Sequence, residues 1–186
     1  MKKFLVFSAV VILAACNSNE STKTDATTDS VKTMAAETMP AIKSPYPISY
    51  SSNFEKDDPK NAETLLALWK AWDNGDLSAA KDMFADSVEL HFSDGSSMHS
   101  TRDSVIASAQ KFRSTFASAV SSVDAVMASK SVDKNEHWAL IWGKEVDTDK
   151  KGKIDSSYLQ ETWRFNNDGK ADLMFQYRQA ANPPKK

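Results

Sequence analysis

Glu161 is the titratable residue whose neighbours in the sequence most suggest chemistry. It lies in an alternating segment, LQETWRF, in which every second side chain is apolar apart from Glu161 itself. A carboxyl group among apolar side chains can act as a general acid or base, or can hold the polar end of a ligand. The alternative is a structural role, in which Glu161 accepts a hydrogen bond from Tyr177 or from a backbone group.

The turn that follows this segment predicts how Glu161 is paired. Residues 167–169, Asn-Asp-Gly, are typical of a three-residue hairpin loop with the glycine in the left-handed conformation. That loop places Arg164 opposite Asp172, a favourable charge pair. Glu161 then lies opposite Phe175 in the middle of an apolar face, whose other members are Leu159, Trp163, Phe165, Leu173 and Tyr177.

The histidines suggest weaker chemistry. His91 and His99 flank the turn dipeptide Asp94-Gly95, and together with Glu89 or Asp94 they could resemble a metal site. A zinc site needs three or four converging ligands, and the domain has no cysteine to contribute, so we predict no metal and no cofactor. His137 lies in the segment EHWALIWGKEV, whose two faces are both apolar. One face could line a cavity and the other could meet a second subunit, or the segment could simply be a central strand.

Three helices are expected to precede the strands that carry Glu161 and His137. Asp58-Pro59 predicts the start of the first helix and Gly75 its left-handed end. Asp76 then caps a shorter helix, and Ser100 or Thr101 begins a third, with Asp103 in a capping-box-like role. The apolar faces of these helices contain Ala62, Leu65, Leu66, Trp69, Trp72, Leu77, Ala80, Phe84, Val105, Ala109, Phe112 and Phe116.

Alternating apolar and polar residues predict one strand between the helices and four strand-like runs after them. Val88, Leu90 and Phe92 mark one strand between the second and third helices, and later runs cover about 120–132, 136–147, 154–166 and 170–179. This order predicts an α+β domain in which helices cover one face of a mostly antiparallel sheet.

The N-terminus has the layout of an export signal. Lys2 and Lys3 precede an apolar run that ends in Leu-Ala-Ala-Cys at Cys16, and the run is too short to span a bilayer comfortably. This stretch resembles the lipobox of bacterial lipoproteins, which implies that residues 1–16 form a lipoprotein signal with its lipobox cysteine, that the chain is cut before Cys16, and that Cys16 is acylated, with palmitate among the expected lipids. An ordinary secretory signal is the alternative.

The remaining boundaries follow from composition. Residues 17–58 are rich in Ser, Thr, Asn and Asp and are expected to form a flexible tether. Residues 59–180 are expected to form the domain, and residues 181–186 a polar tail.

The net charge of −2 argues against a nucleic-acid partner. By resemblance, Asn17 after the cysteine implies an outer-membrane lipoprotein that faces the periplasm, with the cell surface or the inner membrane as alternatives.

The stretches WDNGDLSAAKDMFADSVEL and ETWRFNNDGK, together with the order of elements, resemble the nuclear transport factor 2-like superfamily and its SnoaL-like bacterial branch. The resemblance covers roughly residues 60 to 180. It implies a cone-shaped domain in which a strongly curved sheet wraps around helices and leaves a cavity at one end. Members include ketosteroid isomerases, polyketide cyclases, dehydratases and epoxide hydrolases, and many members only bind ligands or dimerise.

The isomerase members imply specific positions here. Where they have an oxyanion-binding tyrosine this chain has Leu68, and where they have the carboxylate base it has Phe92, so steroid isomerase activity is not expected. Their third polar residue corresponds to Glu161. The resemblance implies a cavity lined by Leu68, Trp72, Phe92, Phe112, Leu159, Glu161, Trp163, Phe175 and Tyr177.

We therefore expect a lipid-anchored envelope protein whose domain binds a small apolar or amphipathic ligand in that cavity. One alternative is an isomerase, dehydratase or cyclase type of enzyme that uses Glu161 as acid and base, with His91 or His137 as a partner. The other is a non-catalytic module that dimerises or docks through the outer face of the sheet.

Overall fold

A computed structural model describes residues 42–181 of the chain. The predicted signal peptide, the predicted acylation site at Cys16, most of the predicted tether and the tail from residue 182 lie outside the described residues. The described elements are β1 (Phe54–Lys56), α1 (Lys60–Asn74), the 3-10 helix η1 (Leu77–Met83), β2 (Phe84–His91), β3 (Ser97–Thr101), α2 (Arg102–Arg113), β4 (Phe116–Ser131), β5 (Glu136–Asp149), β6 (Ile154–Phe165) and β7 (Ala171–Ala180).

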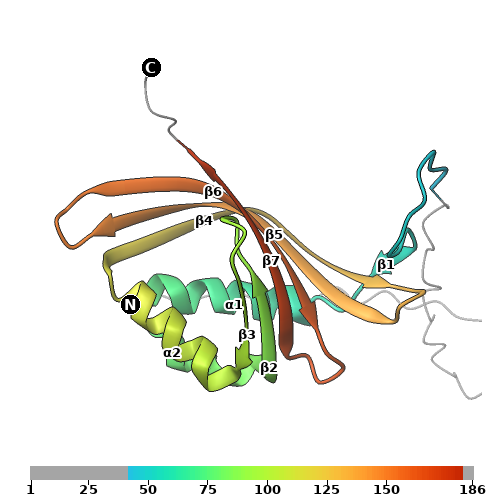
Figure 1. The fold of residues 1–186 in the computed structure, drawn as a ribbon, viewed down its shortest axis with the longest axis horizontal. Coiled ribbons are helices and arrows are strands. Elements are labelled where there is room, and N and C mark those ends of the chain that lie inside the picture. Colours follow the sequence, from blue (N-terminus) through green and yellow to red (C-terminus); the bar gives the residue numbers. More distant parts are fainter. Residues whose placement is uncertain (1–41, 182–186) are drawn as a thin grey trace, which may run out of the picture. The chain divides into compact units, whose positions relative to one another are not determined.

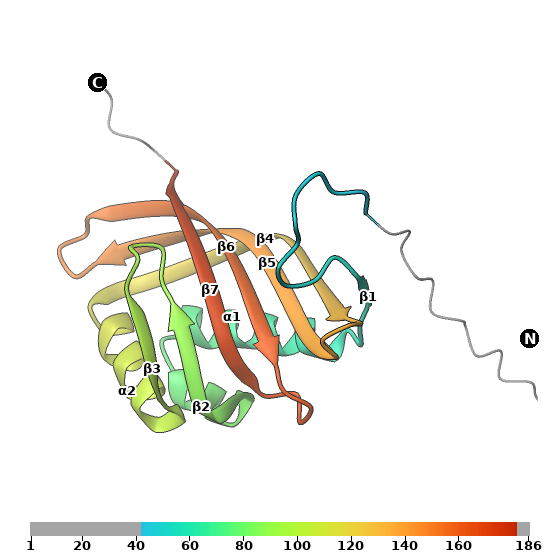
Figure 2. The same ribbon diagram turned by 45° about the vertical axis from the view of Figure 1, so that its right-hand side comes forward.

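These strands form one curved sheet of seven strands in the order β1-β4-β5-β6-β7-β2-β3. All neighbouring pairs are antiparallel except β2 and β7, which are parallel. The helices lie on one face of the sheet, which we call the inner face (Figure 1, Figure 2). The predicted α+β architecture of helices on a mostly antiparallel sheet is therefore confirmed.

The corner between α1 and η1 is held by residues from α2. Gly75 ends α1 in the left-handed conformation, as predicted, with φ of 74°, and Asp76 caps η1 through the backbone N–H of Ser78. Gln110 accepts a hydrogen bond from the Leu77 N–H and donates one to the Gly75 carbonyl. The guanidinium of buried Arg113 donates to the carbonyls of Trp72, Asp73 and Phe116, which satisfies the C-terminal end of α1.

Three details of the predicted helices are wrong. Phe84 and Phe116 belong to strands, where they are the first residues of β2 and β4. Asp103 makes an exposed ion pair with Lys81 at 2.8 Å, whereas the cap of α2 is Thr101, whose hydroxyl accepts a hydrogen bond from the Ser104 N–H. Only a short turn at Ser114 separates Phe116 from the end of α2, so Phe116 still has the spacing of a helical residue. Spacing alone therefore does not show that the helix has already ended.

The predicted register of the β6–β7 hairpin is also wrong beyond its first pair. Gly169 is left-handed, with φ of 69°, and Phe165 pairs with Ala171, as the predicted loop requires. Asp172 is then an extra residue on β7, so Arg164 pairs with Leu173 and Glu161 pairs with Gln176. Such a bulge moves every later side chain of one strand to the opposite face of the sheet.

The sheet extends into the segment expected to be a tether. Phe54–Lys56 forms β1 and pairs with Ser131–Ser129 of β4, so the folded region begins before residue 59. The ring of Tyr50 packs edge-on against Trp138, with centroids 6.1 Å apart, and Asp57 binds His137 Nδ1 at 2.8 Å. Within residues 42–181 no helix is long and apolar enough to cross a membrane.

Gly143 allows α1 to approach the sheet closely. A Cβ atom at this position would lie 2.3 Å from the Ser122 carbonyl oxygen and 2.9 Å from Cζ3 of Trp69. The absence of a side chain therefore lets the Trp69 indole lie directly on β5. From there Trp69 joins the buried core between sheet and helices, which also contains Leu65, Leu68, Phe84, Val88, Val105, Ile141, Leu159, Trp163, Phe165 and Met174.

Candidate functional site

Glu161 is buried on the inner face, as its alternation predicts, and each of its oxygens has a partner. Oε2 accepts hydrogen bonds from the indole N–H groups of Trp69 at 2.8 Å and Trp163 at 2.9 Å, and Oε1 accepts one from the Gln176 amide at 2.9 Å. The residue is 6% exposed. The three donors are neutral, so none of them supplies a positive charge to the carboxylate, and none is the histidine or Tyr177 considered from the sequence.

The other residues expected to line a cavity are divided among several environments. Phe175 and Tyr177 lie on the outer face because of the bulge at Asp172, so the prediction that they face the interior is wrong. Phe175 stacks on His91 with centroids 4.9 Å apart, and Tyr177 is 61% exposed. Phe112 is 58% exposed. Leu68, Leu159 and Trp163 are buried in the core, Phe92 packs against it, and Trp72 contacts Phe112 and Phe116.

The histidines make separate contacts. His91 Nε2 lies 2.9 Å from Glu89 Oε1, and His99 Nε2 lies 3.0 Å from the hydroxyl of Ser87. His137 is bound by Asp57 near β1. Among residues 42–181 no group of three or more His, Cys, Asp or Glu side chains could hold a metal ion.

A second acidic cluster, not predicted from the sequence, lies on the inner face near the end of β5. Glu145 and Asp147 are two residues apart on this strand, so both side chains point to the same face, and they share a hydrogen bond. Asp147 is 5% exposed, and within the described residues its Oδ1 atom has no hydrogen-bond partner. We call Glu145 and Asp147 the carboxyl pair.

The carboxyl pair retains protons more strongly than ordinary acids. Burial raises the pKa of Glu145 to about 8, and the negative charges of Asp147 and Glu161 act in the same direction. Burial also raises the pKa of Asp147, against the lowering effects of its hydrogen bond with Glu145 and of the charges of Arg178 and Arg113. At neutral pH, Glu145 is therefore largely protonated and can donate to the Asp147 carboxylate.

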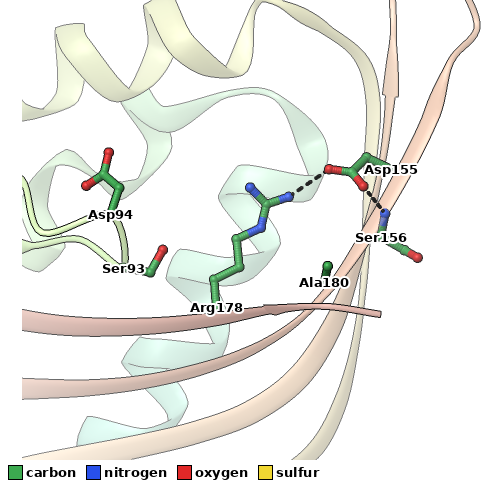
Figure 3. A pocket seen from close by; sticks show the side chains of 6 residues that line it. All are labelled: Ser93, Asp94, Asp155, Ser156, Arg178 and Ala180. Atoms are coloured by element: carbon green, nitrogen blue, oxygen red, sulfur yellow. Dashed lines mark hydrogen bonds and ion pairs between the residues drawn. The ribbon is translucent and has the colours of Figure 1, made fainter. Parts of the chain in front are cut away.

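Arg178, whose positive charge lowers the pKa of both carboxyls, also lines a pocket. Its Nε donates to the hydroxyl of buried Ser157 at 2.8 Å and its Nη2 to Asp155 at 3.1 Å. The pocket has a volume of about 330 Å³, and Figure 3 shows Arg178 extending across it towards Asp155, with Ser93 and Asp94 from the β2–β3 turn nearby. The lining residues are Ser93, Asp94, Asp155, Ser156, Arg178 and Ala180.

The strand register explains why these groups meet. Asp147 pairs with Asp155 and Glu145 with Ser157 across β5 and β6, and Ser157 pairs with Ala180 of β7. The sequence contained one usable signal, since Glu145 and Asp147 continue the inward alternation of Ala139, Ile141 and Gly143. Arg178 could not be assigned to this face, because the bulge at Asp172 reverses the alternation of β7.

Comparison with known proteins identifies the fold. No protein-family model and no curated protein sequence matches the chain. Among solved structures, AusH from Aspergillus nidulans aligns with a TM-score of 0.54 and 14% identity, over 68% of this chain and 88% of AusH. An LEH-like epoxide hydrolase from M. tuberculosis aligns with a TM-score of 0.54 and 9% identity, over 64% of this chain and 83% of that protein.

A third similar structure is itself described by its fold. An NTF2-like protein of unknown function from Burkholderia pseudomallei aligns with a TM-score of 0.52 and 20% identity, over 64% of this chain and 91% of that protein. At such identities the likeness shows the fold alone. The domain has the nuclear transport factor 2-like fold, which confirms the fold implied by the resemblance seen in the sequence and is compatible with ligand binding or with catalysis.

Proposed function

We propose that the domain binds a small polar or amphipathic molecule in the pocket beside Arg178. The observation that carries this proposal is the pocket itself, whose lining includes Arg178, which binds Ser157 and Asp155 and whose charge acts on the carboxyl pair. Ligand sites are concave and contain a few well-placed polar groups, and titratable residues with shifted pKa values are concentrated at such sites. The polar lining favours a polar or amphipathic ligand over the purely apolar one considered from the sequence.

A screen of small molecules by thermal unfolding tests this proposal. A ligand present at about 100 times its Kd stabilises the folded state by about 2.7 kcal/mol, which raises the Tm measurably. The expected hits also move the NMR signals of Ser93, Asp94 and Ala180, and Arg178→Gln weakens their binding. Glu63→Gln, a change at an exposed position on α1, is the matched control. Hits that leave the pocket signals unmoved, or a screen without hits, would contradict the proposal.

A proton-transfer enzyme is the second candidate function. Glu145, with its pKa raised to about 8, can both give and take a proton near neutral pH, as a general acid or base must. Glu161, the acid-base residue considered from the sequence, is less suited because three donors already occupy its two oxygens. Because an LEH-like epoxide hydrolase shares the fold, hydrolysis of a panel of epoxides is the direct assay. Activity that persists in Glu145→Gln would contradict this role.

We further propose that the protein is anchored in the bacterial envelope through an acylated Cys16 and that its domain faces the periplasm. The signal-like N-terminus and its lipobox-like end support this anchor. Two acyl chains give stable membrane attachment, whereas a single chain gives only marginal binding. Labelling cells with a palmitate analogue should mark the wild type in the membrane fraction. A Cys16→Ser variant that still acquires the label would disprove the assignment.

The outer face of the sheet could additionally serve as a homodimer interface. Several of its apolar side chains are exposed, among them Val120, Met127, Tyr158 and Tyr177. Sedimentation of the wild type and of Tyr177→Lys would detect such a dimer and its loss, and a monomeric wild type would exclude it.

A further inference from the structure

The turn between β5 and β6 is strongly basic. Lys150, Lys151 and Lys153 are all exposed there, in a chain whose net charge is −2. Asp149 is the acidic residue of the turn, and its Oδ1 accepts the backbone N–H groups of Lys151 at 2.7 Å and Lys153 at 2.9 Å. Among the described residues the three ammonium groups have no ion pair. We call residues 149–154 the lysine turn.

The lysine turn projects from one end of the sheet. Asp149 pairs with Phe116, the first residue of β4, and Ala180, the last residue of β7, pairs with Ser157. Residues 150–153 therefore extend beyond both strands that flank the β5–β6 hairpin. In Figure 1 and Figure 2 this loop lies at the left end of the domain, beside the junction of α2 and β4. A flat surface can touch such a projection without a matching groove.

Exposed apolar side chains border the lysine turn. Ile154 is 66% exposed, and Phe112, whose ring packs edge-on against Phe116 with centroids 5.3 Å apart, is 58% exposed. Phe116 lies beside Asp149 through the strand pairing, so the aromatic pair adjoins the turn. Lys111, also exposed, precedes Phe112 on α2. Lysines next to exposed apolar side chains are the composition with which protein surfaces bind the interface of a membrane.

We propose that the lysine turn, together with Phe112 and Ile154, docks on a membrane surface that contains anionic phospholipid. The ammonium groups face the lipid phosphates, and the apolar side chains enter the boundary between headgroups and acyl chains. Each lysine near such a surface contributes about a five-fold gain in affinity. This contact is separate from the pocket and from the proposed acylation of Cys16, and it brings the end of β4 that lies away from β1 to the membrane.

Two other partners fit this end of the domain less well. A second copy of the chain, docked through the same end, would bring like charges together. Nucleic acids are bound along a basic stripe or face of a domain, whereas here the cations are confined to one turn of a chain with net charge −2. The projecting shape and the positive charge together favour a lipid surface.

Acetylation of lysines, measured by mass spectrometry, tests this contact in the full chain. The chain is bound to vesicles of phosphatidylcholine alone, or of phosphatidylcholine and anionic phosphatidylglycerol in equal parts. In the anionic vesicles Lys150, Lys151 and Lys153 should react at least about five-fold more slowly than in phosphatidylcholine. Lys134, next to β1, is the internal control and should react equally in both. Salt at about 1 M, where the Debye length is about 3 Å, should remove the protection.

A charge-reversal variant assigns the protection to the turn. Lys150→Glu combined with Lys151→Glu should abolish the protection of Lys153 in anionic vesicles. The matched control reverses Lys60 and Lys134, which lie at the β1 end of the domain, and should leave the protection of Lys153 unchanged.

A second pair of variants tests the apolar part of the contact. Ile154→Ser should weaken the protection of the lysine turn, whereas Ile42→Ser, at a residue that is likewise 66% exposed, should not. Reaction rates of the lysine turn that are the same in both vesicles, or an equal slowing of Lys134, would overturn the proposal. A slowing that grows with protein concentration in the absence of vesicles would indicate self-association through this end and would also overturn it.

Discussion

The environment of Glu161 shows how a buried carboxylate can be structural. Two indoles and one amide donate to it, which joins α1, β6 and β7 at one point. Hydrogen bonds to a charged acceptor contribute more than neutral ones, and an acceptor left with fewer donors is costly when buried. Glu161 therefore connects three elements of the core.

Trp69→Phe tests this role. The variant keeps the ring on the sheet and removes one donor to Oε2, so the free energy of unfolding should fall by about 1.5–3 kcal/mol. Urea denaturation followed by circular dichroism measures the change. Tyr177→Phe, at an exposed position on the outer face, should stay within about 0.5 kcal/mol of the wild type. A loss no larger than that of the control would show that Glu161 does not depend on this donor.

The carboxyl pair predicts an unusual pH dependence. The pKa of Glu145 is about 8 in the folded state and has an ordinary value of 4.5, so between these values the folded state holds a proton that the unfolded state lacks. Stability should therefore fall as the pH rises from 5 to 8, by up to about 1.4 kcal/mol per pH unit. Urea denaturation at several pH values should show a flatter profile for Glu145→Gln. An unchanged profile in that variant would contradict the assignment.

Individual residues differed in how far the sequence could predict them. Glu161 was predictable as a buried carboxyl because alternation along one strand determines which face it occupies. The position of Arg178 on the same face as Glu145 and Asp147 was not predictable, because it depends on pairing across three strands and on one extra residue at Asp172. Local patterns contain no information about such non-local pairing.

At the level of elements, the close contact between α1 and β5 depends on Gly143. The Trp69 ring occupies the space where a side chain would project. Helix ends were predictable here, since Gly75 and Thr101 end or cap their helices through their own chemistry. The bulge in β7 was not predictable from the sequence. Asp172 still accepts a hydrogen bond of 2.9 Å from Arg164, so the expected charge pair forms with or without the bulge.

Gly143→Ala should destabilise the domain strongly. The added Cβ would meet backbone at 2.3 Å, which a side-chain rotation cannot relieve, and overpacking of a core typically costs about 1–3 kcal/mol. Gly152→Ala is the control, since nothing lies within 4 Å of the added atom and only its positive φ, at about 1–2 kcal/mol, is unfavourable. Thermal and urea unfolding compare the two variants. A smaller loss at Gly143 than at Gly152 would show that α1 moves away freely.

For the domain as a whole, the segment before α1 is part of the folded structure. Strand β1 adds an edge to β4, Asp57 binds His137, and Tyr50 covers Trp138 on the outer face. From composition the sequence predicted a tether there, because a strand of three residues is too short to show a period. Any tether must therefore end before these contacts begin.

Truncation separates the tether from the domain. A chain that begins at Asp58 loses β1 and the Asp57 contact, and it should be less stable than one that begins at Ile42 by about 2 kcal/mol or more, given about 1.5–3 kcal/mol for a hydrogen bond to a charged group. A chain that begins at Ser49 lacks only exposed residues and should match the longer one. Equal stability of all three chains would place residues 49–57 in the tether.

The extra residue at Asp172 has a consequence for how this interior could change during evolution. Deleting one residue from β7 at this point would restore the simple register and exchange its two faces. Phe175 and Tyr177 would then point inward, where Gln176 and Arg178 now bind Glu161 and Ser157. A single codon deletion could thus convert a charged interior into an aromatic one on the same scaffold.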